Sequence, residues 1–292
     1  MTSDLDELVT RLRAAGCVFA EEEAQILRRH AADDEELARW ADRRVAGEPL
    51  EHVVGVVEFA GLELSVGPGV FIPRQRTQLI AAVTDAEVTD DPGAVFVEPY
   101  CGAAPIAAVV AQDHPSIAIV ASDIDPAALR YAEMNLGPSS TVVQGRGLAG
   151  LPAELRGSVA VIAAVPPYVP DAELDLMPAE AREFEPLETH SGGCGGLDEV
   201  GLLVEESAGW LRPGGVLLVE LHRDQAPHAI RLAETAGLGA TTVSSRRSTR
   251  TRGWPGWRCR RPTAARAWWS STRRPASRCR YPSDSASPAS SA

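Results

Sequence analysis

The sequence predicts an α/β fold with a mostly parallel sheet, preceded by a small helical domain. From residue 94 onward, short apolar runs alternate with helical segments at the spacing of strand–helix–strand units. The apolar run 159–164 predicts a buried strand, and Pro166-Pro167-Tyr168 follow it almost at once. Because ligands bind just beyond the carboxyl ends of strands in such sheets, we expect this loop to belong to a functional site.

Composition sets the class of protein. The chain has 292 residues, of which 45% are apolar, enough for one large domain with an appendage. No apolar run reaches 18 residues, which argues against a membrane span, and the acidic N-terminus argues against a signal peptide. The five cysteines are scattered without metal-ligand spacing, so we expect free thiols, no bound metal and a cytoplasmic location.

Charge is distributed unevenly along the chain, and all 28 basic residues are arginine. Residues 1–244 hold 16 arginines and 39 acidic residues, a net charge of −23. Residues 245–292 hold 12 arginines and one acidic residue, Asp284, a net charge of +11. This tail is rich in Arg, Ser and Pro and has neither helical nor strand periodicity.

Three interpretations of residues 245–292 are open: a basic arm that binds nucleic acid, a disordered tail, or translation out of frame in a GC-rich gene. We favour the third, because Arg247-Ser248-Thr249-Arg250 can be encoded by codons that, shifted by one base, encode an acidic and apolar segment. Resequencing the gene tests this interpretation.

The first half of the chain divides into two parts. Apolar spacing predicts amphipathic helices over residues 4–15, 21–30 and 34–46, and Gly47-Glu48-Pro49 ends the third. Residues 52–72 alternate and contain regularly placed glycines, which predicts a β-hairpin linker. Thr77 is the expected N-cap of a helix over 78–85.

The second half alternates strands and helices. Asp125 and Pro126 predict the cap and first turn of one helix, and Arg212-Pro213-Gly214-Gly215 ends another. The expected strands cover residues 94–98, 117–122, 141–144, 159–164 and 216–221, and the helices 103–112, 126–136, 197–211 and 224–236.

The turns after the first two strands carry the candidate cofactor site. Glu98 ends the first strand, and Cys101 and Gly102 follow in a small-residue turn where backbone can approach a ligand closely. Asp123, with Ile124 after it, ends the second strand, where a carboxylate can accept both hydroxyls of a ribose. Each acid has a plain structural alternative, an ordinary turn or a helix cap, but the pair at this spacing is more specific than either residue alone.

The loop Val165-Pro166-Pro167-Tyr168 is the candidate acceptor site. An amide nitrogen is a poor nucleophile because its lone pair is delocalised, so acceptors must hold its N–H bonds and aim the lone pair. Tyr168 can pack on the flat face of the amide. The alternative is a proline-rich connector. Cys101 has no paired histidine, which argues against a cysteine nucleophile.

At these residues the chain resembles the release-factor glutamine methyltransferase family, and most closely a branch of protein-(glutamine-N5) methyltransferases. The resemblance covers about residues 1–244. Its motifs are Gly47-Glu48-Pro49-Leu50-Glu51-His52, Pro68–Arg74, Asp123–Ala128, Pro166–Pro170, Met177–Arg182, Gly196-Leu197-Asp198 and Leu211–Gly215.

The resemblance implies a Rossmann-like class I methyltransferase fold, S-adenosylmethionine as the methyl donor, and a glutamine side-chain nitrogen as the acceptor. By position, Glu98, Cys101, Gly102, Asp123 and Ile124 contact the cofactor, and Val165, Pro166, Pro167 and Tyr168 frame the acceptor amide. The arginine-bearing loop at residues 73–77 lies near the cofactor.

Three residues depart from the family pattern. Ala104 replaces a glycine near the cofactor, and Arg146 replaces an acid near the adenine, where we expect only a solvated surface arginine. Val165 replaces the asparagine that holds the acceptor amide. A lost buried polar contact of this kind costs about 1–3 kcal/mol, or roughly 10- to 100-fold in rate.

The family also ends in two antiparallel strands at one edge of the sheet. Residues 241–243 can begin the first, but only Arg-rich sequence follows, so we expect the last strand to be missing and an apolar edge to stay open. We expect four parts: a helical domain, a hairpin linker, a methyltransferase domain and the tail, over residues 1–48, 49–77, 78–244 and 245–292.

Other functions compete with methylation of a protein glutamine. The altered residue Val165 favours a different acceptor, such as a small molecule. The changed cofactor positions favour a non-catalytic remnant. Methylation of a nucleic-acid base uses a similar loop, but a body with a net charge of −23 repels phosphates. We therefore expect a release-factor-like protein partner, with neither membrane nor nucleic acid involved.

Overall fold

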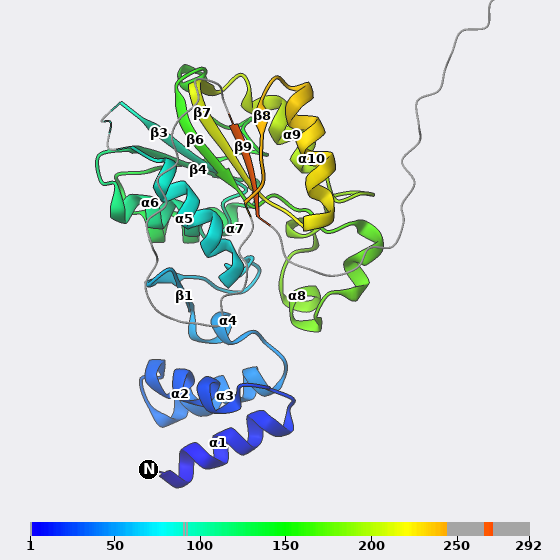
Figure 1. The fold of residues 1–292 in the computed structure, drawn as a ribbon. Coiled ribbons are helices and arrows are strands. Elements are labelled where there is room, and N and C mark those ends of the chain that lie inside the picture. Colours follow the sequence, from blue (N-terminus) through cyan, green and yellow to red (C-terminus); the bar gives the residue numbers. More distant parts are fainter. Residues whose placement is uncertain (1, 90, 92, 244–265, 271–292) are drawn as a thin grey trace, which may run out of the picture.

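The protein was analysed as a computed structural model that describes residues 2–89, 91, 93–243 and 266–270. Three helices form a small layer at the N-terminal end of the molecule (Figure 1). Asp33 begins the third by accepting a hydrogen bond from Glu36 N at 2.8 Å. Their apolar faces bury Leu8, Leu12 and Leu27 in a core of their own. The helices are α1 (Thr2–Ala14), α2 (Ala20–His30) and α3 (Asp34–Val45).

A short helix and a hairpin connect this layer to the sheet. The helix is α4 (Leu50–Val54), and the antiparallel pair is β1 (Val56–Phe59) and β2 (Leu62–Ser65). Gly55 ends α4 with a φ of 81°, a conformation that glycine adopts without steric cost. The expected hairpin over residues 52–72 is therefore shorter than predicted, because its first residues lie in α4.

The main sheet has seven strands, and every neighbouring pair is parallel. This confirms the predicted α/β class and the mostly parallel sheet. The strands, in spatial order, are β5 (Thr141–Gln144), β4 (Ala118–Asp123), β3 (Val95–Pro99), β6 (Val159–Ala164), β7 (Leu211–Glu220), β9 (Arg266–Ser270) and β8 (Gly239–Ala240).

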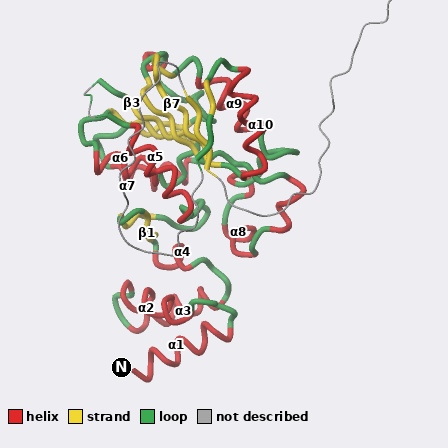
Figure 2. The backbone as a smooth tube through the Cα atoms, in the orientation of Figure 1, coloured by secondary structure: helices red, strands yellow, loops and turns green. Residues whose placement is uncertain are grey.

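Helices cover both faces of this sheet, as Figures 1 and 2 show. One face packs against α5 (Gln78–Glu87), α6 (Pro105–Asp113) and α7 (Pro126–Leu136), and the other against α9 (Asp198–Ser207) and α10 (Ala226–Thr235). The strands read as continuous apolar runs because both of their faces are buried. The long β6–α9 connection holds α8 (Ala179–Phe184). The 3-10 helices are η1 (Gln75–Thr77), η2 (Ala153–Leu155), η3 (Asp171–Leu176), η4 (Leu187–Thr189) and η5 (Arg223–Gln225).

Helix termini test two of the predicted caps. Asp125 caps α7, since its carboxylate accepts a hydrogen bond from Ala127 N at 2.8 Å, as expected. Thr77 does not cap α5: η1 runs directly into the helix, and the buried Thr77 hydroxyl has no hydrogen-bond partner among the described residues. The preceding 3-10 turn holds Thr77 in a helical conformation that no N-cap adopts.

The boundary between α9 and β7 also differs from the prediction. The helix ends at Ser207, and Leu211 already pairs with Val159 of β6. The register then shifts, so that Val216 pairs with Val161. The Arg-Pro-Gly-Gly segment is thus an irregularity inside β7, because the chain joins the sheet before the glycines rather than after them.

The edge beside β7 is not open. Strand β9, from the Arg-rich tail, pairs with all of Val216–Glu220, which corrects the expectation that this segment supplies no strand. Ala267-The antiparallel final strands implied by the resemblance do not occur among the described residues. Residues 244–265 and 271–292, on which the disorder and frameshift interpretations rest, lie outside them.

The strand order places the candidate site. Strand β3 lies between β4 and β6, so the chain winds in opposite directions on its two sides. A crevice forms at the carboxyl ends of strands where this reversal occurs, and ligands bind there in open α/β sheets. None of the helices in the described part of the chain is both long and apolar enough to span a bilayer.

Candidate active site

The turn from β3 to α6 has an unusual backbone. Tyr100, Gly102 and Ala104 have φ values of 55°, 54° and 56°. Only glycine adopts this left-handed region without steric cost, so two non-glycine residues are strained here. The turn is held by a hydrogen bond from Cys101 N to Ser122 O at 3.0 Å. The glycine expected at position 104 thus has a structural reason, and Tyr100 is a second strained position that the sequence did not reveal.

Glu98 is buried at the end of β3. Its carboxylate accepts hydrogen bonds from Ala107 N at 2.6 Å and Ile106 N at 3.3 Å, the free donors in the first turn of α6. Burial is the main cause that raises the pKa of Glu98, to about 8, and the nearby Asp123 raises it further. No cation among the described residues pairs with Glu98.

Asp123 ends β4 beside the same turn. Its carboxylate accepts from Gly102 N at 2.8 Å and from Asp125 N at 3.0 Å. Burial raises the pKa of Asp123 as well. The Ile124 side chain next to it is 59% exposed, a position open for contact with a flat ligand. The two acids therefore form a corner of negative charge without a protein counter-ion.

Arg146 and Cys101 take the roles expected of them from the sequence. Arg146 is largely exposed, and it pairs with Glu199. The Cys101 side chain is buried, and burial, followed by the charges of Asp123 and Glu98, raises the pKa of its thiol. A thiol with a raised pKa is a poor nucleophile, which agrees with the argument against cysteine catalysis.

The loop after β6 is held rigidly. Gln225 of η5 donates from Nε2 to Tyr168 O at 2.8 Å. The Tyr168 hydroxyl donates to Glu220 Oε1 at 3.1 Å and accepts from Arg76 Nη2 at 2.8 Å. Burial, followed by the charge of Glu220, raises the pKa of Tyr168, so the hydroxyl stays protonated. Two prolines and these anchors fix the direction in which the loop faces the crevice.

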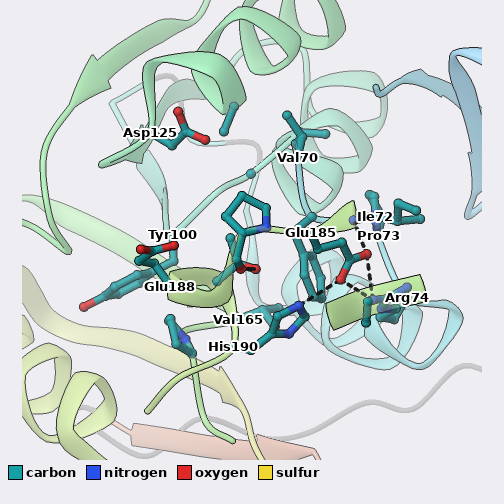
Figure 3. Close-up of a pocket in the computed structure, with 18 of the residues that line it drawn as sticks. Val70, Ile72, Pro73, Arg74, Tyr100, Asp125, Val165, Glu185, Glu188 and His190 are labelled. Carbon is teal, nitrogen blue, oxygen red and sulfur yellow. Dashed lines mark hydrogen bonds and ion pairs between the residues drawn. The ribbon is translucent and has the colours of Figure 1, made fainter. Parts of the chain in front are cut away.

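A second polar cluster lies across from this loop (Figure 3). Glu185, the residue after α8, is buried and accepts two hydrogen bonds from Arg74 Nη2, at 2.6 and 2.7 Å. The backbone N–H of Ile72 donates to the same carboxylate at 3.2 Å. His190 Nε2 lies 3.0 Å from Glu185 Oε2. The His190 ring packs edge-on against Phe71, with ring centroids 5.5 Å apart.

One cavity of about 640 Å³ joins these parts. The acidic corner at β3 and β4, the loop after β6 and the Glu185 cluster all line it. All nine predicted site residues lie on its wall: Glu98, Cys101, Gly102, Asp123, Ile124, Val165, Pro166, Pro167 and Tyr168. The predicted arginine-bearing loop also reaches it, through Pro73, Arg74, Arg76 and Thr77. The structure brings the predicted residues together, while their individual roles remain predictions.

Sequence reasoning missed four polar residues at or behind this wall. Arg74 and Arg76 were noticed only as members of a loop, and Glu185 and Glu220 were not noticed. Glu185 lies 111 residues from Arg74, and Glu220 lies 144 residues from Arg76. Nothing in local spacing predicts such pairs. The one signal available was an acidic residue at the end of a buried apolar strand, as at Glu220.

Known proteins were compared with the sequence. It is 35% identical over 257 residues to the release factor glutamine methyltransferase of Moorella thermoacetica, covering 80% of this chain and 89% of that protein. The chain belongs to the release factor glutamine methyltransferase family. The enzyme of the same name from Mycolicibacterium smegmatis is 33% identical, with 74% of this chain and 82% of that protein covered. The one from Streptomyces coelicolor is 36% identical, covering 62% and 65%.

Solved structures are more distant. TYW2 of M. jannaschii in complex with AdoMet is 11% identical, covers 63% of this chain and 73% of that chain, and has a TM-score of 0.41. TrmN from Thermus thermophilus is 19% identical, covers 54% and 40%, and has a TM-score of 0.36. These likenesses add nothing to the family relationship. No protein-family model matches the sequence.

Proposed function

We propose that this protein transfers a methyl group from S-adenosylmethionine to the side-chain amide nitrogen of a glutamine in a peptide release factor. The observation that carries the proposal is the single cavity that joins the acidic corner at β3 and β4 to the Pro-Pro-Tyr loop after β6. A donor and an acceptor bound at these two places meet within one enclosed space. The family to which the chain belongs supports the same reaction.

The acidic corner suits a cationic cofactor. S-adenosylmethionine carries a sulfonium and an ammonium group, and Glu98 and Asp123 are buried acids with raised pKa values and no cationic partner in the described part of the chain. A bound cation favours their ionised forms. Gly102 leaves room beside them, since a side chain added there meets no atom within 4 Å. Asp123 has lone pairs left for the ribose hydroxyls, and Ile124 can pack on the adenine.

The loop after β6 suits a planar amide. Pro166 and Pro167 carry no backbone N–H, so this stretch of chain offers carbonyl oxygens as acceptors and no donors of its own. Amide N–H groups need such acceptors when the nitrogen lone pair is aimed at a methyl group. Tyr168 supplies a flat surface next to them. When bound, the cofactor supplies an electrophilic methyl group, and the chain contributes position and exclusion of water.

The surroundings of the cavity suit a protein substrate. Three separate segments reach its rim: Pro49 and Glu51 at α4, Glu180 of α8, and Glu188 of η4. In the same connection as α8, the large apolar side chains of Leu176 and Leu187 are 76% and 54% exposed. Exposed apolar residues beside a polar cavity are typical of surfaces that bind another protein. They therefore favour a protein loop over a free small molecule as the acceptor.

Methyl transfer to a purified release factor tests the proposal. The full chain is incubated with S-adenosylmethionine labelled in the methyl group, and the release factor is analysed by peptide mass spectrometry. We expect one methyl group on a glutamine side chain and none on a release factor in which that glutamine is alanine. Asp123→Asn weakens binding of S-adenosylhomocysteine and lowers transfer, whereas the exposed control Asp175→Asn changes neither.

Each result has a distinct meaning. Label that appears on a small molecule and not on protein overturns the choice of acceptor. A cooperative thermal melt that S-adenosylhomocysteine leaves unmoved overturns the cofactor site, because a ligand at 100 times its dissociation constant raises the unfolding free energy by about 2.7 kcal/mol.

A further inference from the structure

His190 has one ring nitrogen tied down and the other free. Nε2 lies 3.0 Å from the Glu185 carboxylate, which Arg74 and the Ile72 N–H hold in place. Nδ1 makes no hydrogen bond to any described residue, and it is not among the buried atoms that lack a partner, so it reaches the cavity surface. Figure 3 shows the ring between Glu185 and the interior of the cavity.

This arrangement selects the tautomer of the neutral ring. Glu185 is paired with Arg74, so it is ionised and can only accept hydrogen bonds. The nitrogen that faces it must therefore carry the proton, which is Nε2. In the neutral ring the other nitrogen, Nδ1, then has a lone pair and no proton. The cavity wall thus presents a hydrogen-bond acceptor at His190.

His190 is also attached to the acceptor loop. Its carbonyl oxygen accepts a hydrogen bond from Val169 N at 2.9 Å, and Gly192 N donates to Val169 O at 2.9 Å. These bonds join the segment of His190 to the residue that follows Tyr168. His190, Val165 and Tyr168 line the same cavity. A change in the loop position moves His190 with it, which keeps the acceptor in register with the bound amide.

The need for such an acceptor follows from Val165. A primary amide has two N–H bonds, and the valine side chain accepts neither, although the resemblance places an amide side chain at this position. We propose that Nδ1 of His190 accepts an N–H of the substrate glutamine and takes that proton during methyl transfer. This role rests on the proposed function, because it needs an amide in the cavity.

The proton and electron balance of the step is complete. The amide nitrogen lone pair forms the bond to the methyl carbon, while the C–S bond breaks and its electron pair stays on sulfur. The N–H bond electrons return to nitrogen, and the proton moves to Nδ1. The resulting imidazolium lies against the Glu185 carboxylate, which stabilises its charge, and it returns the proton to water afterwards.

The charged neighbours of His190 set the conditions for a pH test. Glu185 and Glu188 come from its own segment, Arg74 from the segment before α5, and Tyr168 from the loop after β6. Only the neutral ring can accept the N–H. We therefore expect kcat for methylation of the release factor to fall on the acid side as His190 becomes protonated.

Two substitutions separate the ring nitrogens. His190→Gln keeps a donor near the position of Nε2 but removes the acceptor at Nδ1, and we expect kcat to fall about 100-fold. His190→Asn keeps a carbonyl oxygen near Nδ1 that cannot take a proton, so it recovers part of kcat but loses the acid limb of the pH profile. His30→Gln, on α2, is the matched control and is expected to leave both unchanged. Binding of S-adenosylhomocysteine and the melting temperature report whether each variant is folded.

Nitrogen NMR of the histidine ring gives a readout that does not depend on activity. At neutral pH the free protein is expected to show His190 with a proton on Nε2 and none on Nδ1, and Glu185→Gln is expected to change this ratio. A protein that methylates the release factor equally well as His190→Gln, with the same pH profile, overturns the proposal. So does a spectrum with the proton on Nδ1. Absence of any methylation by the unchanged protein overturns the proposed function instead.

Discussion

Arg76 and Glu220 form an ion pair across the cavity wall, with the Arg76 Nε 2.8 Å from Glu220 Oε1. Arg76 lies in η1, before α5, and Glu220 ends β7, so the pair connects the linker to the centre of the sheet. The Tyr168 hydroxyl lies between them and bonds to both. Glu220 is 2% exposed, and its second oxygen has no partner among the described residues. The charge of Glu220 therefore depends on Arg76.

Loss of this partner is the first prediction. Arg76→Met leaves Glu220 buried without a cation, and we expect the free energy of unfolding to fall by about 1–3 kcal/mol, less than for a fully buried pair because Arg76 is partly exposed. Release of Tyr168 is also expected to raise KM for the release factor. Urea denaturation and steady-state kinetics measure the two effects. Arg39→Met, which removes an exposed pair with Glu35, is the control and changes stability by less than about 0.5 kcal/mol.

The buried acid Glu98 predicts a pH dependence of stability. Its pKa is about 8 in the folded protein, against a model value of 4.5 for an unperturbed glutamate. Between these values the folded state keeps a proton that the unfolded state has lost, so its contribution to stability falls as the pH rises from about 5 to 8. Glu98→Gln removes this contribution. We expect the variant to gain about 1–4 kcal/mol relative to the unchanged protein across that range. Urea titrations at several pH values check it, and parallel curves contradict it.

The strained Ala104 predicts an unusual response to glycine. Ala104→Gly relieves a left-handed conformation that costs about 1–2 kcal/mol, and it loses one buried methyl group worth about 0.8 kcal/mol. The net change is expected to lie between zero and a gain of about 1 kcal/mol. Ala108→Gly, inside α6, is the matched control and is expected to lose about 1–2 kcal/mol. Equal losses in both variants show that the turn is not strained.

Val165 predicts a gain of activity. Val165→Asn adds an acceptor and a donor at the amide site, and we expect kcat/KM for the release factor to rise. The rise is about 10- to 100-fold in a His190→Gln background, and smaller where His190 already holds the amide. The change also costs some stability, since Val165 packs against the core. Val165→Thr, which is similar in size but has a shorter polar group, is expected to gain little.

The sequence by itself determined the class of the fold and most of its elements. Strands at residues 141–144 and 159–164 and the helix at 126–136 occur as predicted, because burial on both faces leaves continuous apolar runs and Asp125-Pro126 starts a helix by local bonding. The acids at the strand ends were predicted for the same reason: they interrupt apolar runs at positions where a parallel sheet places ligands.

Only the tertiary structure decided which distant polar residues meet. Glu185 faces Arg74, and His190 faces Glu185, through folding of the long β6–α9 connection, which has no periodic pattern to predict its path. The strand from the Arg-rich tail was likewise invisible locally, because a strand of five residues is stabilised by pairing with β7 and not by its own sequence. Local pattern reports which faces of the chain are buried, whereas the partners of a buried charge depend on how segments more than a hundred residues apart pack together.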